Sequence, residues 1–456
     1  MIGPRRFVAE TRPEIECVTC GGGRLPPARK EPNVSRETTR RSFLTALAGG
    51  AASVMLAGCG GGKNSASETT LWYWNRSLDD GFLAQANKQF GNLHLQPDKI
   101  AVDFKPKLLT TLAGGSYVPD ITNINSDIAT YFPDGDQFVD LYDLGADKVK
   151  DQYLPWKWEL GVTPGGKMVG FPIDTGPTAF MYRADLFKQA GLPSEPNDVA
   201  KRIESWDGYF SAAEQLQAKV PKTKFVANIT NVYNLSLAQS PKQYFDKQGK
   251  FIGDQEHVKT AWNHAVEAKQ RGLSARTSGD YASDWSAAYS AGGIATLNDA
   301  VWAAYILLEG APGTSGKWRV CHGPGPAGNR GGSFMSITKY NKRPELAFEF
   351  IKWLQQPSLQ TKTYNRIQLF PSCPGSLADK SISAPQKFFG GQGAGGVFAE
   401  AAKELKPAYY SPYEAVVSDS FGNELLNVES LNKNPDKAWE DALSQARRQI
   451  KHLGVS

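Results

Sequence analysis

The 456-residue chain is poor in the residues that hold metals and form disulfides. It contains five histidines and five cysteines, and the histidines form neither an H-x-x-x-H pair nor a cluster with cysteine. A zinc site is therefore not expected, because zinc needs three or four such ligands at short spacing. Cys17 and Cys20 form a lone C-x-x-C, without the second ligand pair or βαβ context of a metal or redox site. No metal and no cofactor are predicted.

Motifs of nucleotide chemistry and nucleophilic catalysis are also missing. There is no G-x-x-x-x-G-K-[ST] loop for ATP phosphates and no G-x-S-x-G nucleophile elbow. Residues 323–328 match G-x-G-x-x-G literally but include two prolines. Because proline lacks a backbone donor, we interpret this stretch as a loop. The chain is thus not expected to bind ATP itself.

Most of the chain has no excess of charge of either sign. The formal net charge is +5, and most of that excess lies in residues 1–58. The near-neutral remainder argues against nucleic acid as a partner. All 11 tryptophans lie in this remainder. Core packing accounts for many of them, but aromatic faces also suit the apolar face of a sugar ring.

The apolar run near the N-terminus is too short to cross a bilayer. Residues 45–58 form a run of 14 apolar and small residues with three glycines, whereas a spanning helix needs about 20 apolar residues. The run follows the pair Arg40 and Arg41 and ends in L-A-G-C at Cys59. This order predicts a twin-arginine export signal followed by cleavage and lipidation at Cys59. The alternative is a buried N-terminal helix.

Export and lipidation divide the N-terminal region. Residues 1–58 are predicted to be an extension plus signal peptide, and residues 59–67, rich in Gly and Ser, a flexible tether. Because export signals begin close to their charged region, we hypothesise that translation starts downstream, near Val34. The mature protein is expected on the outer face of a bacterial cell membrane, held in the bilayer by lipid on Cys59. Cys321 and Cys373 then permit one disulfide, with two buried thiols as the alternative.

Periodicity predicts alternating strands and helices from residue 70 onward. Strands are expected at 70–74, 100–104, 121–124, 171–173, 180–182 and 333–337. Helices are expected at 82–90, 107–112, 184–190 and 346–354 and over much of 206–273. The Gly- and Pro-rich segment 311–332 is predicted to be an irregular crossing. The initial strand–helix–strand order indicates an α/β fold with a parallel sheet.

Four local patterns occur in a fixed order along this part of the chain. They are K-L…L-A-G-G…P-D-I at 107–121, G-F-P-I-D-T-G-P…M-Y-R…L-F…A-G-L-P at 170–193, Y-S-A-G-G-I-A-T with a tryptophan at 289–302, and G-G-S…A-F-E-F-I at 331–351. Together they resemble the family-1 extracellular solute-binding proteins, the sugar-capturing components of ABC importers. The most specific block is 170–193, where Arg183 stands in place of a frequent Asn.

The resemblance implies two α/β lobes of the periplasmic-binding-protein type (type II), joined by a hinge. Residues 68–173 plus 330–355 would form lobe 1, and residues 174–329 plus 356–456 lobe 2. The implied function is capture of a mono- or oligosaccharide and its delivery to a membrane permease with a separate ATPase, without catalysis. The expected partners are therefore the sugar, the permease subunits and the bilayer, with the protein acting as a monomer.

Candidate ligand residues follow from the chemistry of a sugar cleft, which needs aromatic area and paired donors and acceptors. Asn75 ends a strand, where α/β sheets bind ligands, and Asp174 lies at the predicted hinge. Trp302 resembles the ring-stacking tryptophan of the family. For Trp74 the alternative is core packing; for the polar candidates it is turn formation or a surface role. The remaining candidates are Asp120, Asn123, Asn125, Asp284, Trp285, Gly332 and Arg366.

Two other functions share these features. An exported glycoside hydrolase would also use a cleft with aromatics and would need two carboxyls flanking the scissile bond. Asp120 and Asp174 are the nominees for that pair, although no hydrolase motif accompanies them. A ligand-sensing surface lipoprotein without a transporter is the second alternative.

Overall fold

Two β-sheets organise the residues that the computed structural model describes, 68–406 and 408–454. The first sheet has the order β2-β1-β3-β8-β4. Its strands are β1 (Thr69–Tyr73), β2 (Leu95–Lys99), β3 (Ile121–Ile124), β4 (Phe171–Pro172) and β8 (Phe334–Ile337). β1 pairs in parallel with β2 and β3, whereas β8 pairs antiparallel with β3 and β4. The predicted parallel α/β unit is confirmed, with an antiparallel strand that returns from much later in the chain.

The second sheet is smaller and wholly antiparallel. Its order is β6-β5-β7, with β5 (Thr178–Arg183) between β6 (Thr296–Ala300) and β7 (Trp318–Cys321). Each sheet has its own hydrophobic clusters, so the described chain has the predicted two-lobe α/β fold.

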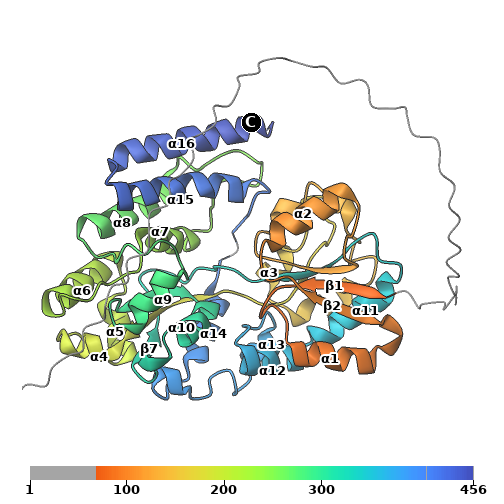
Figure 1. Ribbon diagram of the computed structural model, residues 1–456, viewed down its shortest axis with the longest axis horizontal. Coiled ribbons are helices and arrows are strands. Elements are labelled where there is room, and N and C mark those ends of the chain that lie inside the picture. Colours follow the sequence, from red (N-terminus) through yellow and green to blue (C-terminus); the bar gives the residue numbers. More distant parts are fainter. Residues whose placement is uncertain (1–67, 407, 455–456) are drawn as a thin grey trace, which may run out of the picture. The chain divides into compact units, whose positions relative to one another are not determined.

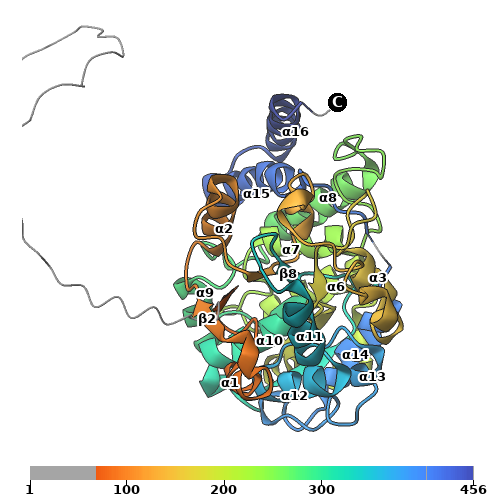
Figure 2. The same ribbon diagram turned by 90° about the vertical axis from the view of Figure 1, so that its right-hand side faces the viewer.

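Helices cover both sheets. Figure 1 shows α1 (Asp80–Gln89) and α11 (Pro344–Leu354) beside β1 and β2. Figure 1 also shows α15 (Glu414–Leu431) and α16 (Pro435–His452) lying side by side, and in Figure 2, turned by 90°, α16 stands above α15. The other helices are α2 (Phe104–Gly114), α3 (Pro155–Glu159), α4 (Ala184–Gln189), α5 (Pro196–Arg202), α6 (Trp206–Lys219), α7 (Ile229–Ala238), α8 (Glu256–Gln270), α9 (Ser283–Ser290), α10 (Val301–Gly310), α12 (Pro357–Ile367), α13 (Pro374–Leu377) and α14 (Ala394–Glu404).

Alternate residues of β1 pack on opposite faces of the sheet, against different hydrophobic clusters. Leu71 and Tyr73 pack into the cluster that contains residues of α1 and α11, whereas Trp72 packs with α2 on the other face. Trp72 is 7% exposed, so it is a core residue. Trp74, beyond the end of the strand, is half-buried and belongs to neither buried cluster.

Two of the local predictions are wrong. The strand expected at 100–104 does not form there: β2 ends at Lys99, and Phe104 begins α2. Val102, expected to alternate inward, is 74% exposed. The segment 311–332 is only partly irregular, because Trp318–Cys321 forms β7 against β5. Both errors arise because strand pairing depends on distant partners rather than on local alternation.

Three chain segments pass side by side between the sheets. Arg330 N donates to Gly176 O over 2.8 Å, and Thr175 N donates to Phe370 O over 2.9 Å. Gly176 permits this approach, since a Cβ there would lie 2.1 Å from the Arg330 carbonyl oxygen. These contacts make the region around 174–177, 329–333 and 370–372 the connection between the lobes.

The predicted Cys321–Cys373 disulfide does not form. Both cysteines are free and buried, so the alternative of two buried thiols holds. The physical reason is their placement: Cys321 packs with the second sheet and Cys373 with the first. Burial raises the pKa of both thiols, that of Cys373 to about 12.

The predicted export signal, the lipidation site Cys59 and the tether lie outside the described residues. Among the residues that are described, no helix is both long and apolar enough to span a membrane.

Candidate binding cavity

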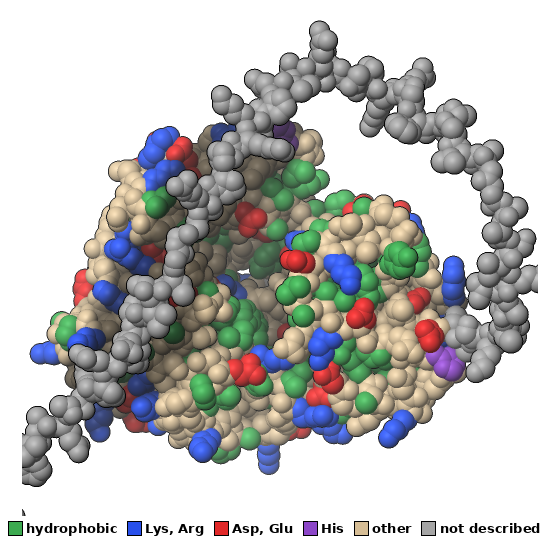
Figure 3. Space-filling model, viewed as in Figure 1, with side chains coloured by type: hydrophobic (Ala, Val, Ile, Leu, Met, Phe, Trp, Pro, Cys, Tyr) green, Lys and Arg blue, Asp and Glu red, His purple; other side chains and the backbone are tan. Residues whose placement is uncertain are grey.

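A cavity of about 630 Å³ is lined by residues from segments beside both sheets. Figure 3 shows the surface hollowed in this region. One wall comes from the ends of β1 and β3 (residues 74–77 and 125–130), and the other from α7, α10 and residues 410–418. Residues 329–334, part of the connection between the lobes, complete the lining. Six of the predicted ligand residues line it: Trp74, Asn75, Asn125, Asp174, Trp302 and Gly332.

The turn after β1 presents Trp74 and Asn75. Ser77 holds this turn, because its Oγ accepts from Trp74 N (3.1 Å) and donates to Trp74 O (2.8 Å). The indole of Trp74 meets the edge of Phe104 at a centroid distance of 5.0 Å. Because Phe104 packs against only one side of the Trp74 indole, the rest of this half-buried ring is available to the cavity that Trp74 lines.

Asp174 and Gly332 lie where two of the connecting segments meet. Asp174 Oδ1 accepts from Ser333 N at 2.7 Å and from Ser333 Oγ at 2.5 Å. Gly332 has φ +91°, and a Cβ there would lie 2.6 Å from Asp174 O. Asp174 therefore holds together two chain segments that are 159 residues apart. This contact fixes the position of both backbones at the cavity.

A buried ammonium lies beneath these residues. Lys157 is 0% exposed, its Nζ has no hydrogen-bond partner, and it lies 3.3 Å from the centroid of the Phe334 ring. Burial lowers the pKa of Lys157 to about 7, opposed by Asp174. Burial likewise raises the pKa of Asp174, opposed by Lys157 and by the hydrogen bonds from Ser333.

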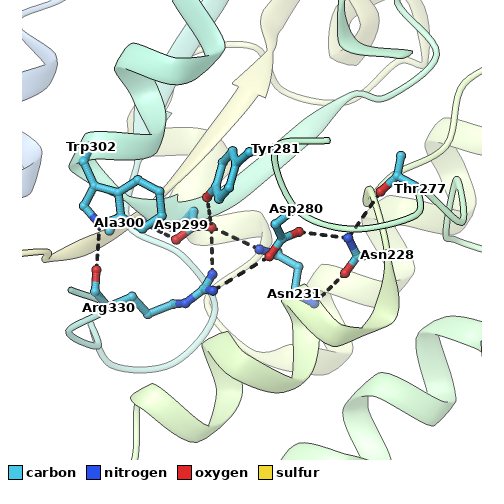
Figure 4. Close-up of polar contacts among 9 residues, drawn as sticks. All are labelled: Asn228, Asn231, Thr277, Asp280, Tyr281, Asp299, Ala300, Trp302 and Arg330. Carbon is cyan, nitrogen blue, oxygen red and sulfur yellow. Dashed lines mark hydrogen bonds and ion pairs between the residues drawn. The ribbon is translucent and has the colours of Figure 1, made fainter. Parts of the chain in front are cut away.

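Trp302 is held on two sides (Figure 4). Its Nε1 donates to Arg330 O over 2.8 Å, and the Tyr281 ring packs against it edge-on at a centroid distance of 5.2 Å. The single indole donor is therefore already used by the protein. What remains for a ligand is the aromatic surface of the ring.

The Arg330 side chain enters a buried polar network next to Trp302 (Figure 4). Its Nη1 donates to Asp299 Oδ2 at 2.7 Å, and its Nη2 lies 3.8 Å from Asp280 Oδ2. Asp299 is 0% exposed and also accepts from Tyr281 Oη (2.6 Å) and Asn231 Nδ2 (3.1 Å). Burial raises the pKa of Asp299, and Arg330 opposes that shift.

Five predicted residues do not line the cavity. Asp120 accepts from the N and Oγ1 of Thr70, both at 2.9 Å, and Asn123 is buried with its Nδ2 on Ser77 Oγ. Asp284 is exposed and accepts from Ser278 N over 2.7 Å, and Trp285, 0% exposed, packs in the core. Arg366 pairs with Asp79 over 3.0 Å.

Several lining residues were not predicted from the sequence. Arg330 adjoins the G-G-S motif, which is a signal that was available. Arg76 and the segment around Glu414 carry no such signal. Glu414 accepts from Tyr244 N (3.0 Å) and Ser411 N (3.2 Å), and burial raises its pKa to about 7. Near neutral pH the wall at Glu414 can therefore present either a carboxylate or a carboxylic acid.

Comparisons of the sequence and of the structure with known proteins match the same class of protein. The family model described as "Bacterial extracellular solute-binding protein" matches residues 82–390. The arabinooligosaccharide-binding protein of Bacillus subtilis (strain 168) is 24% identical over 428 residues, covering 87% of this chain and 96% of the relative.

Solved structures match in fold. A crystal structure of a family 1 extracellular solute-binding protein is 28% identical with a TM-score of 0.78, covering 84% of this chain and 99% of its own. The galacto-N-biose/lacto-N-biose I-binding protein of the ABC transporter from Bifidobacterium longum, solved with lacto-N-biose, is 21% identical with a TM-score of 0.72, covering 86% and 99%.

Proposed function

The chain belongs to the family of bacterial extracellular solute-binding proteins, and on that premise we propose that it captures a mono- or oligosaccharide and delivers it to an ABC importer. The observation that carries the proposal is the cavity of about 630 Å³ to which Trp74, after β1 of the first sheet, and Trp302, on α10 after β6 of the second, both contribute. This volume falls within the roughly 300 to 1,000 Å³ of small-molecule sites.

The lining suits a polar solute that has apolar faces. Two indoles offer flat apolar area, and Asn75 and Asn125, which carry side-chain amides, line the same cavity. Amides both donate and accept hydrogen bonds, as sugar hydroxyls do, so they can replace the water that a sugar loses on binding. The arabinooligosaccharide- and lacto-N-biose-binding relatives support the carbohydrate class.

Capture proceeds by movement of the lobes without a chemical step. A solute that contacts both walls binds the closed arrangement more tightly and shifts the population toward it. Residues 68–173 plus 330–355 and residues 174–329 plus 356–456 remain our proposal for the two moving bodies. We further propose that the protein acts as a monomer that presents the closed form to permease subunits.

Location is the second part of the proposal. Export by the twin-arginine route and lipid on Cys59 would place the lobes on the outer face of the cell membrane. Arg40→Lys with Arg41→Lys should retain the precursor in the cytoplasm, and Cys59→Ser should release the protein from the membrane fraction. Mass spectrometry of the N-terminal peptide tests both steps, and an unmodified Cys59 in the membrane-bound protein would contradict them.

Isothermal titration calorimetry with arabinotriose, lactose and lacto-N-biose tests the capture of a carbohydrate. We expect saturable binding to at least one sugar, with affinity lowered about ten-fold by Trp74→Ala, since an aromatic contact contributes roughly 0.5–1.5 kcal/mol. Trp353→Ala, on α11 and outside the cavity lining, is the matched control and should bind normally. No heat with any sugar of a wider panel would overturn the proposal.

The same titrations separate capture from hydrolysis. A hydrolase needs two carboxyls flanking the glycosidic bond, but Asp120 is bound to Thr70 and does not line the cavity beside Asp174. Chromatography of the sugar after incubation should therefore recover it intact, and released monosaccharide would favour the glycoside hydrolase instead.

A further inference from the structure

Arg76 connects the wall from the first sheet to the wall from the second. It lies in the turn after β1 that brings Trp74 to the cavity, and its guanidinium carbon lies 3.3 Å from the centroid of the Tyr305 ring. Tyr305 belongs to α10, which also carries Trp302. A guanidinium over an aromatic face is attracted by the ring quadrupole. The contact therefore joins the two walls directly.

Two further contacts fix the guanidinium. Its Nη2 donates to Ile367 O over 3.0 Å, and its Nη1 lies 4.0 Å from Glu309 Oε2. Glu309 lies one helical turn beyond Tyr305, so the two side chains share a face of α10. The Arg76 side chain is 23% exposed, which is low for an arginine at the end of a strand.

The Tyr305 contact contributes more than the ion pair. Glu309 is 55% exposed and at the limit of ion-pair distance, and exposed pairs of this kind contribute little. The cation–π contact, by contrast, involves a guanidinium mostly removed from water, where such contacts are stronger. The ring face of Tyr305 is thus the part of α10 that holds Arg76.

The backbone supports the same interpretation. Arg76 has φ +65°, a left-handed conformation that non-glycine residues adopt rarely and at a cost in free energy. Ser77 N donates to Trp74 O over 3.1 Å, which closes the turn around this conformation. A strained residue persists where the surrounding contacts over-determine it, and here those contacts come from α10 and the end of α12.

We propose that Arg76 and Tyr305 form an interlobe latch, which sets the separation of the two lobes before a ligand arrives. Arg76 acts in this role as a positioning residue. A contact present at one lobe separation and absent at another biases the equilibrium between them. The latch rests on the two-lobe fold and is independent of which solute the cavity binds.

Distance measurement on the full-length, ligand-free chain tests the latch. Nitroxides are attached to p-acetylphenylalanine placed at Tyr117 in the first lobe and Leu431 in the second, which are 93% and 74% exposed. Double electron–electron resonance then reports the lobe separation. Tyr305→Leu should change the population ratio of the separations about five-fold, the equivalent of a cation–π contact of roughly 1 kcal/mol. Tyr305→Phe keeps the ring face and should leave the distribution unchanged.

Two controls keep the test decisive. A label pair at Leu431 and Leu453, both on the α15–α16 hairpin, should be unaffected by every variant, and Arg76→Gln should reproduce the shift of Tyr305→Leu. The latch is refuted if Tyr305→Leu leaves the 117–431 distribution unchanged, or if Tyr305→Phe shifts it equally. A change in the 431–453 pair would also refute it, because that would indicate local unfolding.

Discussion

Removing the Arg330 guanidinium should show how much the buried ion pair with Asp299 contributes to the free energy of unfolding. Arg330→Met leaves Asp299, which is 0% exposed, with three neutral donors, Tyr281 Oη, Asn231 Nδ2 and Ala300 N. Removing one partner of a buried pair costs about 3–5 kcal/mol, because the other charge stays buried. Since three hydrogen bonds to Asp299 remain, we expect a cost at the low end of this range, about 3 kcal/mol.

A double-mutant cycle isolates the pair itself. Asp299→Asn leaves Arg330 with Asp280 at 3.8 Å, and we expect it to cost about 3 kcal/mol as well. The double variant removes both charges, so its cost should fall short of the sum by about 2 kcal/mol. Urea denaturation followed by tryptophan fluorescence measures all four proteins.

The pH dependence provides a second readout of the same reasoning. Burial raises the pKa of Asp299, and Arg330→Met removes the charge that opposes this shift. In the variant the folded protein therefore binds a proton that the unfolded chain releases, so its deficit should shrink as the pH falls. Additive costs below 1 kcal/mol for each single change, with no pH dependence, would refute the assignment of a buried ion pair.

Three further predictions concern stability. Burial lowers the pKa of Lys157 from its usual 10.5 to about 7. The free energy of unfolding should therefore rise between pH 7 and 10.5, and Lys157→Met should remove that rise. The same pH dependence of urea denaturation in both proteins would contradict this prediction. Gly176→Ala places a Cβ 2.1 Å from Arg330 O and should cost about 3 kcal/mol, whereas Gly165→Ala, whose nearest contact is 3.8 Å, should cost under about 1 kcal/mol in thermal unfolding. At φ +65°, Arg76→Gly should be more stable than Arg76→Ala by about 1 kcal/mol, and equal melting temperatures would show that the strain is absent.

Local sequence was a good guide to elements whose cause is local. The helix predicted at 346–354 appears as α11 because its apolar residues repeat at helical spacing. The strand predicted at 121–124 appears as β3. The prediction of a strand at 100–104 is wrong. The strand β2 lies nearer the N-terminus, where it pairs with β1 residues more than twenty positions away.

Ligand residues were predictable where a motif marks the connection between the lobes. Asp174 and Gly332 belong to the two glycine-rich motifs and line the cavity. Trp285, on α9, is 0% exposed and packs in the core, and the sequence alone does not distinguish a core tryptophan from a cavity tryptophan. Arg366 had the chemistry of a ligand residue but lies against Asp79 instead.

The α/β class, the family and the helices and strands with strong periodicity are encoded in residues close together along the chain, through spacing and short motifs. Which side chains face the cavity is set by segments that meet from far apart, as Asp174 meets Ser333 across 159 positions. The bridge from Arg76 to Tyr305 belongs to this second kind. Such contacts depend on how two sheets pack beside their shared connection, which leaves no periodic signal in the sequence.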